Sequence, residues 1–212
     1  MGKLYAEISV SLDGYVAGPD ISPDNPLGEG GERLHDWVTA LASWKESHGK
    51  SGGSTGPDDE LMKQSIARGG AVIMGKNMFG PGQGGPSDDG SWQGWWGDDP
   101  PFHQQVFVLT HTKREPLQLS DTTFTFVNDG PESALEQARD AAGDDDVQIA
   151  GGASAIQQYL RGGQLDELFL HVAPILLGGG VRLFDGDQAR LECTRVIPSA
   201  GVTHLSYRPA TA

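Results

Sequence analysis

The sequence predicts a single α/β domain over residues 1–212. Short apolar strands alternate with amphipathic helices along the chain, and no linker divides it. The one cysteine, Cys193, can form neither an intramolecular disulfide nor a cysteine-based zinc site, so a hydrophobic core must hold the fold together. The 31 glycines cluster without a fixed period and therefore mark loops, not structural repeats.

The first part of the chain is predicted to form one strand and two helices. Apolar and polar residues alternate over 3–10, the period of a half-buried strand, and Asp13-Gly14 then supplies a turn. Apolar residues at helical spacing predict a continuous helix over 32–44. Pro57, followed by three acidic residues, is a typical helix start, and this helix should run to about Arg68.

The remaining elements follow a regular β/α alternation. Two short apolar strands, 71–74 and 106–109, should be buried on both faces, and the glycine-rich loop between them contains three tryptophans that argue for order. Beyond them, the patterns predict a strand over 123–127, a helix over 131–142, a strand over 147–150, a helix over 153–160, and strands over 166–173, 191–197 and 201–208, the last two as an antiparallel pair.

Charge and composition exclude several classes of protein. Fifteen basic and 29 acidic residues give a net charge of −14, which repels nucleic acid and anionic lipid. No apolar run approaches the roughly 20 residues of a membrane span, and the N-terminus lacks the pattern of a secretory signal. The six histidines show no metal-binding spacing. We therefore predict a cytoplasmic protein without a metal, a membrane or a nucleic-acid partner.

The ends of the predicted strands are the places where a ligand is expected. In α/β sheets, ligands bind beyond the carboxyl ends of strands, where helix N-termini present unpaired N–H groups. Gly151 and Gly152 would let the backbone approach a phosphate, and the helix that follows directs its positive end to the same place. The alternative is that the two glycines only make a tight turn. The spacing is not GxGxxG, which disfavours a standard Rossmann domain.

Five motifs in order, SLDGYVAG, VIMGKNMF, VFVLT, VQIAGGAS and LDELFLHVAPILLGGGVRLFDG, give the chain a family resemblance. From Lys3 to Tyr207 it resembles the bacterial dihydrofolate-reductase-like proteins that share the C-terminal reductase domain of the bifunctional riboflavin-biosynthesis enzyme. The resemblance implies a three-layer fold with a central mixed sheet of about eight strands and flanking helices. It also implies a homodimer that binds NADPH and reduces a small molecule.

The resemblance also implies which residues contact the cofactor. The pyrophosphate would be held by the GGAS motif, Gly151, Gly152, Ala153 and Ser154. Phosphate groups would be met from the other side by the GKNM motif, Gly75, Lys76, Asn77 and Met78. The 2′-phosphate would lie beside Thr110 and His111, and the nicotinamide ribose would lie against Val16 and Ala17. Lys113 and Arg114 add positive charge that favours NADPH over NADH, unless they form only a solvated turn.

Two acids are candidates for catalysis. In folate reductases a carboxylate on the first helix organises proton delivery, and here that helix offers Glu32 and Asp36, of which Asp36 is the better candidate. An acid in the first turn of a helix can equally serve as a partner of the helix dipole. Asp13 is the second candidate, although an Asp-Gly pair is also a strong turn former.

The long loop bears on the substrate. From Asn77 through Thr112 there is no lysine or arginine, whereas Asp88, Asp89, Asp98 and Asp99 are present, which disfavours folates and phosphorylated pyrimidines. Trp95 and Trp96 would suit a neutral or aromatic ligand, unless the loop aromatics only pin the loop to the core. The predicted function is an NADPH-dependent oxidoreductase for a small neutral substrate. The alternative is a non-catalytic dimeric protein that binds a nucleotide or small ligand.

Overall fold

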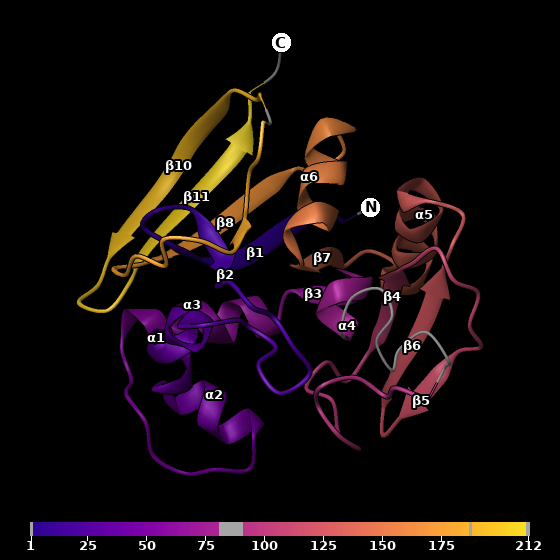
Figure 1. The fold of residues 1–212 in the computed structure, drawn as a ribbon, viewed down its shortest axis with the longest axis horizontal. Coiled ribbons are helices and arrows are strands. Elements are labelled where there is room, and N and C mark those ends of the chain that lie inside the picture. Colours follow the sequence, from indigo (N-terminus) through magenta and orange to yellow (C-terminus); the bar gives the residue numbers. More distant parts are fainter. Residues whose placement is uncertain (1, 81–90, 187, 211–212) are drawn as a thin grey trace.

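The computed structural model describes residues 2–80, 91–186 and 188–210, which form a nine-stranded mixed sheet with helices on both faces (Figure 1). The strand order is β10-β11-β8-β1-β7-β3-β4-β6-β5. The six central strands are parallel, and β5, β11 and β10 run antiparallel to their neighbours, which confirms the predicted α/β fold. These strands are β1 (Leu4–Ser11), β3 (Gly69–Gly75), β4 (Gln105–Leu109), β5 (Leu117–Leu119), β6 (Thr122–Val127), β7 (Asp146–Gly151), β8 (Glu167–Ala173), β10 (Leu191–Pro198) and β11 (Thr203–Pro209).

One face of the sheet packs against two helices, α5 (Pro131–Ala142) and α6 (Ala153–Arg161). The alternation of β1 directs Leu4 and Ala6 to this face, where they join Ile149 of β7. Ala138 of α5 and Ile156 of α6 are fully buried in the same core. Alanines on the inner side of α5 let this helix lie close to the strands.

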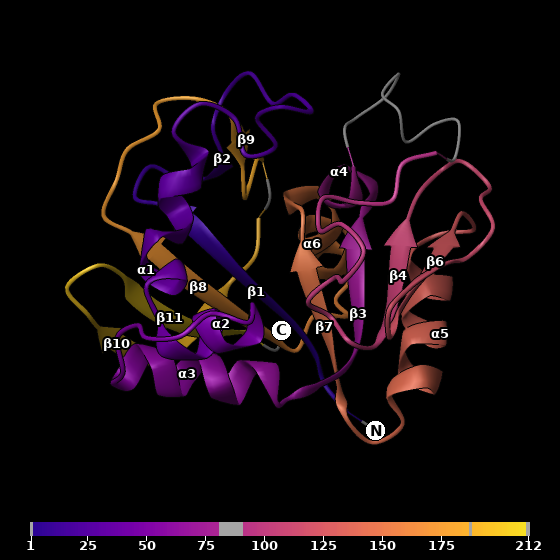
Figure 2. The same cartoon turned by 90° about the horizontal axis from the view of Figure 1, so that it is seen from below.

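The opposite face has two separate covers (Figure 2). The first consists of α1 (Asp36–Thr39), α2 (Ala42–Ser47) and α3 (Pro57–Ile66), whose apolar cluster includes Trp37, Val38 and Leu41. The second consists of α4 (Lys76–Phe79) and the segment 91–102, whose aromatic residues pack over Phe124 of β6. None of the helices among the residues described is long and apolar enough to cross a membrane.

The two central strands separate part-way along the sheet. β1 and β7 pair only from Leu4 to Ala6, opposite Val147 to Ile149. Beyond this point β1 remains paired with β8 as far as Ser11, whereas β7 continues beside β3. The sheet is therefore split at its centre towards the carboxyl ends of the strands, and this split lies between the two covers.

The predicted continuous helix over 32–44 is wrong. The structure has a 3₁₀ helix, η1 (Gly31–His35), then α1 and α2, with Leu41 in an extended conformation between the last two. The backbone on either side of Leu41 is hydrogen-bonded to Ser54. The Ser54 N–H donates to the Ala40 carbonyl at 2.9 Å, and the Ser54 carbonyl accepts from the Ala42 N–H at 2.9 Å. The buried Asp59 carboxylate then accepts from the Ser43 N–H at 2.7 Å, which caps α2 from a neighbouring helix.

Three short strands were not predicted from the sequence: β5, β2 (Tyr15–Ala17) and β9 (Val181–Arg182). Each has two or three residues, too few to show a period of two. β2 and β9 form a separate antiparallel pair, which ties the loop after β1 to the loop after β8. This pair lies beyond the carboxyl ends of the parallel strands (Figure 2).

Candidate functional site

Two glycine-containing turns come together beyond β3 and β7. A Cβ atom built on Gly75 would lie 3.5 Å from the Gly152 nitrogen, and one built on Gly151 would lie 3.2 Å from the Met78 sulfur. β3 and β7 are parallel neighbours, so their carboxyl ends meet at the same edge of the sheet. The structure thus brings the GKNM segment and the GGAS segment together.

Gly152 faces open space. Among the residues described, leaving aside its chain neighbours and the backbone of α6, no atom would lie within 4 Å of a Cβ built on it, and the peptide that joins it to Gly151 is cis. The nine-residue helix α6 begins at the next residue, Ala153, and the first N–H groups of a helix have no partner within it. Ala153 is buried and Ser154 is exposed. An anion placed here would meet the positive end of the α6 dipole.

The segment after β4 lies at the same edge of the sheet. Thr110 is held by a hydrogen bond from its N–H to the Val127 carbonyl at 3.0 Å, and His111 and Lys113 are exposed. Arg114 is engaged elsewhere: its guanidinium lies 4.5 Å from the Phe126 ring and donates to the Trp92 carbonyl at 2.5 Å. Of the predicted basic pair, only Lys113 extends into solvent.

Asp13 closes the turn between β1 and β2. Its carboxylate accepts from the Ser11 hydroxyl at 2.6 Å and from the N–H groups of Leu177 and Gly178 at 3.1 and 2.8 Å. The Ser11 hydrogen bond, with these N–H groups, lowers the pKa of Asp13 to about 2 against the opposing effect of burial. These hydrogen bonds come from a serine hydroxyl and two backbone N–H groups, none of which could supply Asp13 with a proton, and they join the turn to the loop after β8. The geometry therefore favours the turn-forming role over catalysis.

The remaining residues of the first loop are part of the β2–β9 pair. Ala17 is paired with Val181 and is buried, and Val16 packs against the main core. Gly180 approaches this strand closely, because a Cβ atom on it would lie only 2.1 Å from the Ala17 carbonyl oxygen. The loop that contains Val16 and Ala17 is thus fixed at the same end of the sheet as α4 and the start of α6 (Figure 2).

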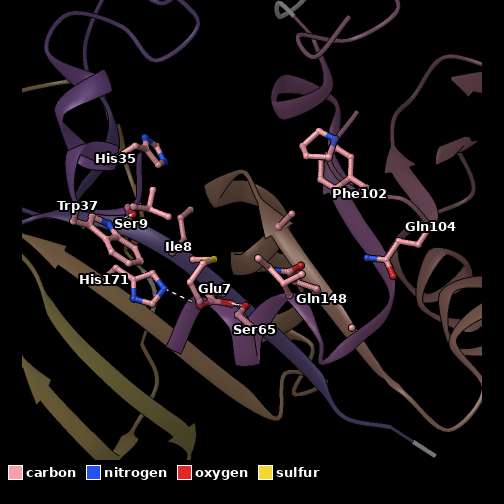
Figure 3. A pocket seen from close by; sticks show the side chains of 16 residues that line it. Glu7, Ile8, Ser9, His35, Trp37, Ser65, Phe102, Gln104, Gln148 and His171 are labelled. Carbon is pink, nitrogen blue, oxygen red and sulfur yellow. Dashed lines mark hydrogen bonds and ion pairs between the residues drawn. The ribbon is translucent and has the colours of Figure 1, made fainter. Parts of the chain in front are cut away.

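A cavity of about 270 Å³ opens between the two covers of the sheet (Figure 3). Its floor is formed by β1 and β7 where they separate, with Ile8 and Ala150 on either side. Trp37 and His35 lie on one wall, and Phe102 and Gln104 lie on the other. The other lining residues are Glu7, Ser9, Val38, Met62, Ser65, Ile66, Gly69, Pro101, Gln148 and His171. Within the part of the chain that the structure describes, this lining contains one carboxylate and neither lysine nor arginine.

Glu7 is the acid of this cavity. Its side chain is 10% exposed, one oxygen accepts from the Ser65 hydroxyl, and the other lies 2.9 Å from His171 Nε2. Burial raises the pKa of Glu7, but the hydrogen bond and charge of His171, with the Ser65 hydroxyl and Arg68, lower it below its usual value. Glu7 is therefore a buried carboxylate that is held as an anion by its partners.

Comparison with known proteins identifies the family. The model of the family described as "RibD C-terminal domain" matches residues 3–205 of the chain. The chain belongs to the RibD C-terminal domain family. One curated relative, "Uncharacterized protein YyaP" of Bacillus subtilis (strain 168), is 27% identical over 118 residues, which are 52% of this chain and 62% of that protein.

Solved structures of this family and of dihydrofolate reductase share the fold. A "Putative riboflavin biosynthesis protein" from Shewanella sp. PV-4 matches with a TM-score of 0.65 and 23% identity over the full length of both chains. A dihydrofolate reductase from Enterococcus faecalis, solved with NADP(H), matches with a TM-score of 0.56 and 13% identity over 99% of this chain and 98% of that one. The predicted dihydrofolate-reductase-like architecture is thereby confirmed.

Asp36 does not reach the cavity of this RibD C-terminal domain. It is exposed at the start of α1, whereas its neighbours His35 and Trp37 line the cavity. Because residue 36 begins a new helix after η1, its side chain faces solvent, which favours the alternative in which Asp36 is a partner of the helix dipole. The cavity carboxylate is Glu7, on β1.

Trp95 and Trp96 also lie outside the cavity lining. The Trp96 ring packs against Phe102 at 4.8 Å and stacks over Phe124 at 6.0 Å. Trp95 contacts Trp92, whose indole N–H donates to the Phe79 carbonyl at 2.9 Å. This packing supports the alternative in which the tryptophans attach the loop to the sheet. The cavity itself is lined by the aromatic side chains of Trp37 and Phe102.

The sequence analysis missed Glu7 and His171 as site residues. Each lies within a strand, where polar residues at alternate positions are expected to face solvent. The sequence signal for this site was an acid, Glu7, in the first strand and a histidine, His171, in an apolar strand. The two residues are 164 positions apart, and their contact depends on the pairing of β1 with β8. Asp88 and Asp89, whose charges entered the expectation about the substrate, lie outside the residues described.

Proposed function

We propose that this protein is an NADPH-dependent oxidoreductase that reduces a small neutral substrate in the cavity beside Glu7. The observation that carries the proposal is the split in the sheet. It joins an open glycine edge, suited to phosphates, to a cavity lined by aromatic rings and one hydrogen-bonded carboxylate. Membership of a reductase family and the fold shared with an NADP(H)-bound dihydrofolate reductase support the same activity.

The residues at the carboxyl edge fit a dinucleotide phosphate group. Gly152 leaves its Cβ position open, α6 directs its positive end to the same point, and Gly75 lies beside Gly152. Gly151, Gly152, Ala153 and Ser154 would hold the pyrophosphate from one side. Gly75, Lys76, Asn77 and Met78 would meet it from the other side, Thr110 and His111 would flank the 2′-phosphate, and Val16 and Ala17 would flank the nicotinamide ribose. NADPH supplies a hydride when it is bound.

The cavity favours a substrate without negative charge. Among the described residues that line it, Glu7 is the only carboxylate, and none is a lysine or arginine that could neutralise an anion. Two like charges about 4 Å apart cost on the order of 4 kcal/mol at near-surface dielectric, whereas a stacked aromatic pair contributes about 1 kcal/mol. Trp37 and Phe102 provide apolar walls, and Gln104 and Gln148 provide neutral hydrogen-bonding groups.

Titration with NADPH tests the proposal directly. We expect quenching of tryptophan fluorescence with saturation, followed by loss of absorbance at 340 nm when a reducible neutral aromatic or carbonyl compound is added. Saturable NADPH binding without oxidation across a broad substrate panel would favour the non-catalytic ligand-binding alternative. Absence of binding would contradict the assignment of the carboxyl edge as a cofactor site.

A further inference from the structure

A continuous chain of hydrogen bonds runs from the cavity to the surface beneath α3. Glu7 Oε1 lies 2.9 Å from His171 Nε2, and His171 Nδ1 lies 2.7 Å from His204 Nδ1. His204 Nε2 then lies 3.2 Å from Asp58 Oδ1, whose other oxygen accepts from the Ser199 hydroxyl at 2.6 Å. We call Glu7, His171, His204 and Asp58 the proton chain.

The Nδ1–Nδ1 contact fixes the number of protons in this chain. One imidazole must donate and the other must accept, so one proton lies between the two rings. A carboxylate can only accept when it is ionised, so each outer contact also needs one proton. The three hydrogen bonds therefore require three protons. Two neutral imidazoles carry only two N–H protons, so the chain needs one extra proton. Because its partners hold Glu7 as an anion, the extra proton belongs to the other three groups of the chain.

The two ends of the proton chain have different access. Glu7 and His171 line the cavity, where a substrate would lie (Figure 3). The side chains of His171 and His204 are each 4% exposed, whereas Asp58 is 24% exposed and can exchange protons with water. The Trp37 ring packs against both imidazoles, at 4.7 Å from His171 and 5.0 Å from His204.

We propose that Glu7 is the proton donor of the reduction and that His171, His204 and Asp58 hold the proton it delivers. This inference rests on the reductase function proposed above. Reduction of a C=O or C=N bond adds hydride, with its electron pair, to carbon, while the π electron pair forms a new bond from the heteroatom to a proton. That proton passes first from His171 Nε2 to the Glu7 carboxylate and then from Glu7 to the heteroatom, so Glu7 is an anion before and after the step. Solvent replaces the proton after the product leaves.

Charged and titratable groups from several elements act on the proton chain. Glu7 comes from β1, His35 from η1, Asp58 from α3 and Arg68 from the turn before β3. Burial lowers the pKa of His204, the charge of His171 lowers it further, and Asp58 and Glu7 partly restore it. Burial also lowers the pKa of His35, against the effect of Asp36. His35 is thus a neutral neighbour at pH 7 and adds no competing charge.

The proton chain can be tested in the free protein without a substrate. In ¹⁵N-labelled protein, we expect the shared Nδ1 proton to resonate far downfield, and the two imidazoles to titrate as a coupled pair. Asp58→Asn removes a carboxylate that stabilises the protonated pair, so the apparent pKa of the pair should fall. Asp121→Asn is the matched control, because Asp121 pairs with His103 at 2.7 Å on the surface, outside the cavity lining.

Kinetics with any substrate identified at 340 nm provide the second test. Glu7→Gln should lower kcat about 100-fold with unchanged NADPH affinity, in the range typical of a lost general acid. His204→Ala should also lower kcat, and added imidazole, which can fill the vacated space, should restore part of it. In Asp58→Asn, kcat should begin to fall at a lower pH than in the wild type, whereas Asp121→Asn should match the wild type.

Separate results would overturn this inference and the proposed function. Independent titration of His171 and His204 in the free protein, or a wild-type kcat in Glu7→Gln, would rule out the proton chain as the donor. A second pair of results would also overturn the inference: imidazole fails to restore the kcat lost in His204→Ala, and the pH profile of Asp58→Asn is unshifted. These results would mean that the histidines have only a structural role. Absence of NADPH binding would instead contradict the proposed function, and the imidazole titration would still decide whether the proton is shared.

Discussion

Met78 and Gly151 meet beyond the carboxyl ends of β3 and β7, where a Cβ atom at residue 151 would lie 3.2 Å from the Met78 sulfur. Gly151 also has a φ of 139°, which side chains rarely permit, so both space and conformation require glycine there. Gly152 differs, since its φ of −77° suits any residue and its Cβ position is open. The first glycine therefore shapes the turn, and the second leaves room for a ligand.

Replacing Gly152 with valine should remove cofactor binding without unfolding the protein. The added side chain would project into the space proposed for phosphate, at a backbone conformation that valine can adopt. We expect the Kd for NADPH to rise at least tenfold, a loss of about 1.4 kcal/mol. Fluorescence titration measures the Kd, and Gly201→Val, another open position, is the control. An unchanged Kd in a folded Gly152→Val protein would mean that the glycine pair is only structural.

The protein should bind NADPH more tightly than NADH. Lys113 is the exposed cation of the segment after β4, whereas Arg114 is held against Phe126 and Trp92. We expect Lys113→Ala to weaken NADPH binding two- to fivefold, about 0.5–1 kcal/mol, and to leave NADH binding unchanged. The effect should shrink at high salt because an exposed charge is screened. Lys50→Ala is the control, and equal affinities for the two cofactors at low salt would contradict the prediction.

Aromatic substrates should depend on Phe102 and not on Trp95. Phe102 lines the cavity, so Phe102→Leu would remove one ring contact of about 1 kcal/mol while keeping an apolar side chain. We expect KM for a neutral aromatic substrate to rise about fivefold, with little change for Trp95→Ala, and dihydrofolate turnover to be absent or very slow. Efficient dihydrofolate reduction would show that the electrostatics of the cavity have been misread.

Stability should fall in acid through the ion pairs of Arg68. Arg68 contacts the Asp146 and Glu167 carboxylates and lies 4.2 Å over the Tyr5 ring. Burial raises the pKa of both acids, but their hydrogen bonds with Arg68 and Lys3 lower it overall. Because the folded pKa values are lowered, their contribution is complete above the unfolded values near 4 and is lost as the pH falls through the folded values.

Urea unfolding of an Arg68→Gln variant measures this contribution. We expect the free energy of unfolding to drop by about 2 kcal/mol at pH 7, and by less at the lowest pH at which the protein stays folded, because the two carboxylates take up protons as the pH falls through their lowered pKa values. Arg33→Gln, at an exposed position of η1, is the control. An equal loss at both pH values would show that Arg68 acts through its packing on Tyr5 and not through its charge.

The protein should form a dimer through the edge of its sheet. β10 is the terminal strand, and Val196 on it is 56% exposed, which leaves apolar surface and one unpaired strand edge. Light scattering at micromolar concentration should give twice the chain mass, and Val196→Lys should shift the protein towards monomer. A monomeric wild-type protein would rule this prediction out.

Local sequence determined most of the elements of this fold. Helix α5 spans Pro131–Ala142, as predicted, because its proline start, alanine-rich inner side and following Gly143 are all local signals. The central strands are likewise marked by apolar runs that end at turn residues. The glycine turn after β7 was identified for the same reason, since the backbone freedom of glycine can be recognised from the sequence.

Tertiary structure decided the features that depend on distant partners. The helix predicted over 32–44 is interrupted because backbone groups of residues 40–43 form hydrogen bonds with Ser54 and Asp59 in place of hydrogen bonds within a helix. Arg114 is held away from the proposed cofactor site by its hydrogen bond to the Trp92 carbonyl, 22 positions away. The pairing of Glu7 with His171, and of His171 with His204, arises only when β1, β8 and β11 become neighbours in the sheet. Periodicity reports which face a residue occupies, but the partner on that face is set by strand order, which no local pattern encodes.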